Sequence, residues 1–140
     1  MKTAISFLAA SIFSQASFAA CPELTGTYDC FGEAGKSIHV ELKNLNGTTY
    51  KLEDQIVIRA SELGVETVKN GSDYRMVMNA TCRDQALDIE TEMFNPKDGT
   101  FLSFVQRTYV PQASGDVDIL VTWNDSKNTE SNLIRCQKKN

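Results

Sequence analysis

Apolar and polar residues alternate most clearly in the stretch Tyr74-Arg75-Met76-Val77-Met78-Asn79-Ala80-Thr81-Cys82. Its aromatic, methionine, alanine and cysteine residues share one parity, and mostly polar residues share the other. Successive side chains of a strand point to opposite faces, so the stretch predicts a strand with one buried face. Residues 87–93 repeat the pattern, with apolar positions alternating against acidic ones. Residues 83–85 between them are predicted to form a turn.

Elsewhere in the chain, the same period of two predicts strands at residues 24–31, 38–43, 50–52, 55–60, 100–110, 117–123 and 132–138. Asn46-Gly47 and Asn95-Pro96-Lys97-Asp98-Gly99 have the composition of hairpin turns. Residues 61–72 have no clean period. The chain is therefore predicted to be all-β, an antiparallel up-and-down meander of eight or nine strands. Such a sheet leaves two edges unless it closes, which favours a closed or nearly closed barrel; a β-sandwich is the alternative.

The beginning of the chain has the three-part plan of a secretory signal peptide. Lys2 precedes an apolar run over residues 4–13, and small residues follow before Cys21. Ser17 and Ala19 satisfy the small-residue rule for cleavage, which predicts a signal at residues 1–19 and a single domain at residues 20–140. The short leader with one lysine is typical of a bacterial signal, so the protein is expected to be secreted or periplasmic. The alternative is a lipoprotein anchored through Cys21, because Phe18-Ala19-Ala20-Cys21 partly matches the lipobox.

Four cysteines are expected to form disulfides in that oxidising compartment, namely Cys21, Cys30, Cys82 and Cys136. A closed barrel places its first and last strands side by side. Cys21, before the first strand, is then predicted to pair with Cys136 near the end of the last. Cys30 is left to pair with Cys82. No Cys-x-x-Cys pair occurs in the sequence, and neither a metal site nor a cofactor is predicted.

Charge argues against a nucleic-acid partner. The 140 residues carry 14 Lys and Arg against 18 Asp and Glu, a net charge of −4, with no basic cluster of useful length. Binding to phosphates needs such a cluster. No apolar run approaches the roughly twenty residues that a membrane-spanning helix needs, so stable membrane insertion is not expected. The oligomeric state does not follow from the sequence.

No catalytic constellation is predicted. His39 is the single histidine, and its parity places it on a polar face. Glu90 and Glu92 share a strand face and are best interpreted as solvated acids, although a carboxylate hydrolase is a third hypothesis. Soft and aromatic side chains are instead expected to converge inside the barrel, where they either line a pocket for an apolar ligand or fill the core: Tyr28, Tyr50, Tyr74, Met76, Met78, Met93 and Trp123.

The segment Cys21-Pro22-Glu23-Leu24-Thr25-Gly26-Thr27-Tyr28 resembles the first strand of calycin barrels, the lipocalin and avidin group, which opens with a Gly-x-Trp motif. Tyr28 stands where that family has Trp. The resemblance implies a barrel that binds a small apolar molecule, with Arg135 of the last strand packed across the aromatic ring. The predicted function is a non-enzymatic binding protein. The alternative is a protease inhibitor or another module that binds an extracellular protein, since small barrels of this kind also serve that role.

Overall fold

The computed structural model describes residues 21–32, 37–52, 56–125 and 127–139, and these form one ten-stranded antiparallel sheet. The predicted signal at residues 1–19 lies outside the described residues. The strands are β1 (Gly26–Phe31), β2 (Ser37–Asn44), β3 (Thr49–Leu52), β4 (Ile56–Arg59), β5 (Val65–Asn70), β6 (Arg75–Arg83), β7 (Ala86–Phe94), β8 (Phe101–Pro111), β9 (Val117–Asp125) and β10 (Thr129–Lys138).

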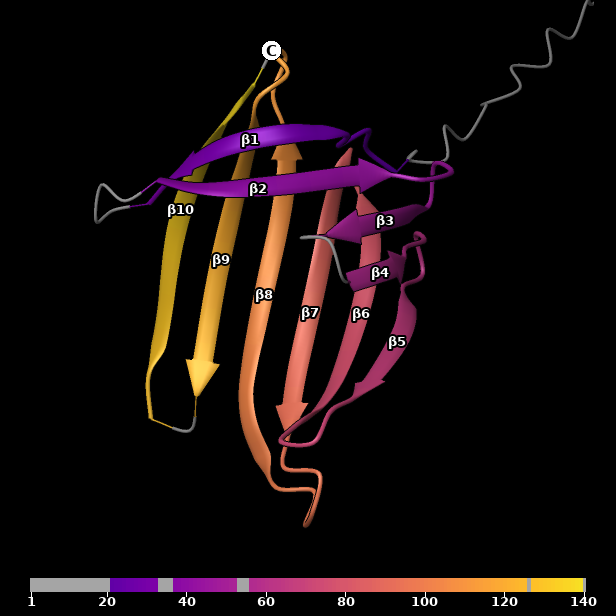
Figure 1. The fold of residues 1–140 in the computed structure, drawn as a ribbon, viewed down its shortest axis with the longest axis vertical. Coiled ribbons are helices and arrows are strands. Elements are labelled where there is room, and N and C mark those ends of the chain that lie inside the picture. Colours follow the sequence, from indigo (N-terminus) through magenta and orange to yellow (C-terminus); the bar gives the residue numbers. More distant parts are fainter. Residues whose placement is uncertain (1–20, 33–36, 53–55, 126, 140) are drawn as a thin grey trace, which may run out of the picture.

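The sheet curls into a nearly closed barrel. Its strand order is β4-β3-β2-β1-β10-β9-β8-β7-β6-β5, so the meander is joined through β1 and β10 and interrupted between β4 and β5. Figure 1 shows β1 and β2 crossing above the long strands β6 to β10. At the interruption, a single parallel bridge joins Ser61 to Thr81. The all-β meander is confirmed, and its one continuous sheet is a barrel with an unsealed seam rather than a sandwich.

Several turns between strands contain residues with positive φ angles. Gly47 in the β2–β3 turn has a φ of 82°, and Gly99 in the β7–β8 turn has a φ of 72°. Asp84 and Gln85 in the β6–β7 turn also have positive φ, at 48° and 62°. Two consecutive positive φ angles match the right-handed twist of the strands that they connect. The predicted turns at these three places are confirmed.

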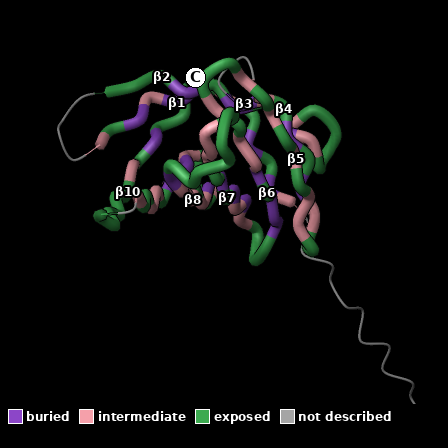
Figure 2. The backbone as a smooth tube through the Cα atoms, turned by 90° about the horizontal axis from the view of Figure 1, so that it is seen from below, coloured by how far each residue is buried: buried purple, intermediate pink, exposed green. Residues whose placement is uncertain are grey.

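The core fills one end of the barrel. Along β1, β2, β3 and much of β7, buried residues alternate with more exposed ones, and Figure 2 shows the buried segments in purple from below. The residues 21–25, here called the strap, cross this end. Tyr50 donates a hydrogen bond from its hydroxyl to the Pro22 carbonyl at 2.7 Å, and the Tyr28 hydroxyl donates to the Leu24 carbonyl at 3.2 Å. Leu24 itself is fully buried. The strap thus covers the filled end, and its backbone carbonyls hold it there by accepting hydrogen bonds from the two tyrosines.

Both disulfides form, but the predicted pairing was wrong. Cys30 is bonded to Cys136, and Cys21 is bonded to Cys82. The neighbouring positions of β1 and β10 were expected correctly, but the register places Cys30, not Cys21, directly opposite Cys136. Cys21 lies five residues before β1, in the strap, which carries it across to β6. The two bonds fit an oxidising compartment.

The bond to Cys82 also bears on the lipid-anchor alternative. A lipoprotein anchor requires a thioether on the Cys21 sulfur, and that sulfur is already joined to Cys82. A lipid thioether on Cys21 and the Cys21–Cys82 disulfide therefore exclude each other. In the described part of the chain there is no helix long and apolar enough to span a membrane.

Candidate functional site

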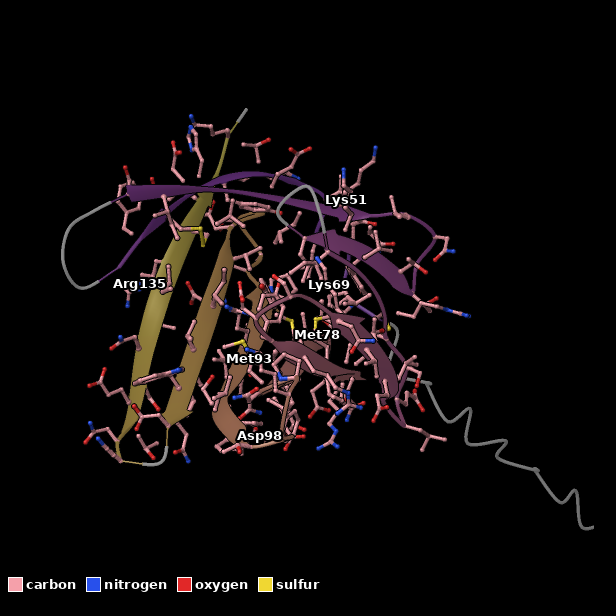
Figure 3. The ribbon with its side chains drawn as sticks, turned by 60° about the horizontal axis from the view of Figure 1, so that its bottom comes forward. Lys51, Lys69, Met78, Met93, Asp98 and Arg135 are labelled. Atoms are coloured by element: carbon pink, nitrogen blue, oxygen red, sulfur yellow. A yellow bond between two sulfur atoms is a disulfide. The ribbon has the colours of Figure 1, made fainter. Side chains whose placement is uncertain are left out.

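A cavity of about 140 Å³ opens on the inner face of the sheet, and methionines line it. Met76 and Met78 come from β6, Met93 comes from β7, and they all share the inward parity. The chain has four methionines, and the three other than Met1 are these. Figure 3 shows Met78 and Met93 within the curve of the sheet. We call this hollow the methionine cavity.

A second cavity of about 220 Å³ lies on the same inner face toward β9, β10 and β2. Its wall is formed mostly by branched aliphatic residues: Ile38, Val40, Ile119, Val121 and Ile134. Arg107 and Tyr109 line both cavities. The two cavities therefore flank a shared pair of residues on β8, and the inner face is only partly filled by its own side chains.

The other expected lining residues are not part of either cavity. Tyr28 and Tyr50 are buried in the filled end, where their hydroxyls hold the strap. Tyr74 precedes β6, and its ring packs against Gly71 in the β5–β6 turn. Trp123 has the inward parity on β9 opposite Val105, and it is 37% exposed. Of the seven expected residues, the three methionines reach a cavity and Trp123 lies next to one.

Tyr50 illustrates the cost of ionising a group in the filled end. Burial raises the pKa of Tyr50 to about 12, and the Glu23 carboxylate contributes in the same direction. Burial also raises the pKa of Tyr28. These hydroxyls are therefore neutral donors to the strap over the whole physiological range.

Alkaline pH is expected to destabilise the protein through these two groups. An unfolded tyrosine loses its proton near pH 10, whereas folded Tyr50 keeps it until about pH 12, so the stabilisation is complete below pH 10 and is lost as pH rises through about 12. The loss for Tyr50 is on the order of 2 kcal/mol. Urea unfolding at pH 8 to 11.5 measures it. Tyr50→Phe is expected to flatten the pH dependence, and an unchanged slope in that variant would contradict the assignment.

Arg107 is the inner-face residue that the sequence did not indicate. Its cross-strand neighbours are Ile89 on β7 and Val121 on β9, and both are apolar. The Arg107 side chain is exposed at the wall of both cavities. No carboxylate of the described residues forms an ion pair with it. Residues 100–110 are apolar on both parities, so the sequence did not show which residues of β8 face the inside of the barrel. The presence of an arginine within this apolar run was the one feature of the sequence that could have indicated a site.

The expected packing of Arg135 across Tyr28 was wrong. Arg135 lies opposite Phe31 and Asp118, on the outer face, whereas Tyr28 points inward. Figure 3 shows Arg135 directed away from the concave side. Lys138 is the basic residue opposite Tyr28, and its Cε would lie 2.8 Å from a Cβ built on Gly26. A side chain at position 26 would therefore collide with the Lys138 side chain, which runs beside the Tyr28 ring.

His39 lies on the outer face with both ring nitrogens engaged. Nδ1 contacts the Asp29 carboxylate, and Nε2 lies 3.0 Å from the Lys139 ammonium. A neutral ring with its proton on Nδ1 satisfies both contacts, donating to Asp29 and accepting from Lys139. Because neither nitrogen faces a nucleophile, this arrangement is a surface network that joins β1, β2 and the end of β10.

The outer face also carries the acidic residues of the third hypothesis. Glu90 and Glu92 lie with Glu66 around a shallow hollow that Asn79, Val77 and Phe104 complete. All three carboxylates are exposed, and the lining contains no basic or nucleophilic side chain. Within the described ranges, no group of three His, Cys, Asp or Glu residues is placed to hold a metal ion.

No family model matches the chain, and neither a curated protein nor a solved structure matches it.

Proposed function

We propose that this chain is a non-enzymatic binding protein that works outside the cytoplasm and holds a small apolar molecule against the inner face of its barrel. The observation that carries the proposal is the convergence of Met76, Met78 and Met93 on one cavity. Methionine is flexible and polarisable, and methionine-rich surfaces adapt to ligands of varied shape. A small domain gains stability by filling its interior, so retaining two hollows there has a packing cost that ligand binding explains.

Two further features support the proposed extracytoplasmic compartment and the proposed class of binding protein. The pair of disulfides suits a secreted or periplasmic protein, which is where a signal at residues 1–19 would direct it. A barrel that is closed at one end and hollow inside suits the calycin-type resemblance of the segment around Gly26 and Tyr28. In this proposal the filled end and the strap give rigidity, while the inner face of β6 to β9 supplies the ligand site.

A displacement assay with a neutral fluorescent probe tests the proposal. N-phenyl-1-naphthylamine is expected to gain emission on binding, and 1-dodecanol is expected to displace it. Val105→Phe places a larger side chain in the methionine cavity and is expected to weaken probe binding at least tenfold. Val110→Phe makes the same change on the outer face of the same strand, where Val110 is 38% exposed, and is expected to leave binding unchanged.

Thermal melts of both variants separate a loss of the site from a loss of the fold. Absence of any probe response in the folded wild-type protein would contradict the proposal. Equal binding by folded Val105→Phe and by the wild type would contradict the assignment of the site to the methionine cavity.

A further inference from the structure

We infer that the ligand is an amphiphile with an acidic headgroup, carboxylate or phosphate, and that Arg107 binds this headgroup between the two cavities. The inference rests on the proposed function and specifies the ligand chemistry. It depends on the placement of one strong cation in a wall that both cavities share and whose other lining side chains are uncharged.

Among the described residues, none that neighbours Arg107 on the inner face supplies a counter-charge. Its neighbours along the inner face of β8 are Val105 and Tyr109, and its cross-strand neighbours are Ile89 and Val121. A cation among apolar side chains is unfavourable unless an anion or water compensates it. The Arg107 side chain is exposed, so water reaches the guanidinium and compensates its charge. An acidic headgroup would replace that water.

The acidic groups that share the inward parity lie at the far ends of their strands. Asp125, at the end of β9, accepts hydrogen bonds from the backbone N–H groups of Lys127 and Asn128 at 2.7 Å each and so caps the β9–β10 turn. Glu130 lies opposite Trp123 on β10 and makes no ion pair with Arg107. In the described part of the chain neither carboxylate competes for the guanidinium.

The chemistry of arginine narrows the headgroup. Its planar guanidinium presents paired N–H donors that fit carboxylate and phosphate oxygens, and it stays charged at any physiological pH. The apolar part of the ligand then lies against Met76, Met78 and Met93 on one side or against the aliphatic wall of the second cavity on the other. A half-buried cation, Lys69, shares the inward parity on β5 opposite Met76 and adds positive charge at the same side of the sheet.

Competition for N-phenyl-1-naphthylamine by three twelve-carbon ligands tests this inference: dodecanoate, dodecyl phosphate and 1-dodecanol, each kept below its micellar concentration. The wild type is expected to bind at least one of the two acids about tenfold more tightly than the alcohol. The acid that binds more tightly identifies the headgroup. Arg107→Met is expected to weaken binding of the preferred acid about tenfold and so remove the preference, and Arg107→Lys is expected to retain part of it. Arg135→Met removes an exposed arginine from the outer face and is the matched control, with no expected change.

The outcomes separate the two proposals. If the alcohol binds as tightly as both acids, or if Arg107→Met keeps the acid preference, the headgroup assignment is overturned and the apolar site stands. If no ligand displaces the probe and the probe itself does not bind, the proposed function fails and this inference fails with it. A preference that Arg135→Met abolishes would place the anion on the outer face and overturn the role of Arg107.

Discussion

Replacing Cys30 and Cys136 together by alanine is expected to lower the free energy of unfolding by about 4 kcal/mol. The bond joins residues separated by 106 positions, and a crosslink over such a loop restricts the unfolded chain strongly. The cysteines face each other in the β1–β10 ladder, whose backbone hydrogen bonds remain in the variant. The fold is therefore expected to survive, and urea unfolding measures the loss.

The second disulfide provides the matched comparison. Cys21 and Cys82 are separated by 61 positions, so their joint replacement by alanine is expected to cost about 0.5 kcal/mol less. This variant also releases the strap, and faster amide exchange is expected at Leu24. A loss below about 1 kcal/mol in both double variants would contradict the crosslink account. Single replacement of Cys21 tests the pairing: a thiol label found on Cys136 instead of Cys82 would contradict it.

Tyr50→Ala is expected to destabilise the protein by about 3 to 5 kcal/mol, because it leaves a cavity in the filled end. The Tyr50 side chain has no exposed surface. Tyr50→Phe keeps the ring and removes only the hydrogen bond to the Pro22 carbonyl, so a loss of about 1 kcal/mol is expected. The carbonyl retains a weaker bond from the Asn44 amide at 3.4 Å, which limits the effect.

Tyr74→Ala is the control for Tyr50→Ala. Tyr74 is half-buried and packs over a glycine in a turn, so its loss is expected to cost much less. Thermal melts and urea unfolding measure all three variants. Equal losses from Tyr50→Ala and Tyr74→Ala would contradict the assignment of Tyr50 to the filled end.

Parity made most of the fold predictable. The alternation over β6 and β7 predicts both strands and their buried faces, because one side of each meets the core and the other meets water. β5 was missed because it is an edge strand that pairs only with β6. Its inward residues Val65, Thr67 and Lys69 are only partly buried, so their apolar signal is weak.

The register between paired strands could not be predicted from the sequence. Parity assigns Cys30 and Cys136 to inner faces but does not fix how far β1 slides along β10, and the disulfide pairing depends on that slide. The path of the strap could not be predicted either. Two tyrosine hydroxyls and a disulfide hold the strap in place on its way to β6, and these contacts leave no periodic pattern in the sequence.

The candidate site was predictable in part for the same reason. The methionines follow the clear alternation of β6 and β7, whereas Arg107 lies in β8, where residues on both parities are apolar. Trp123 shares the inward parity of its strand, but its distance from the filled end leaves it partly exposed. Only the register of β8 against β7 and β9 places Arg107 among Ile89 and Val121.

Methionine-methyl NMR reports directly on whether Met76, Met78 and Met93 line a ligand-binding cavity. Methyl-labelled protein would be titrated with 1-dodecanol and with dodecanoate, and the signals would be assigned by single Met→Leu variants. All three signals are expected to shift together and to saturate at one ligand per protein. Three unshifted signals in the presence of excess of both ligands would contradict this expectation.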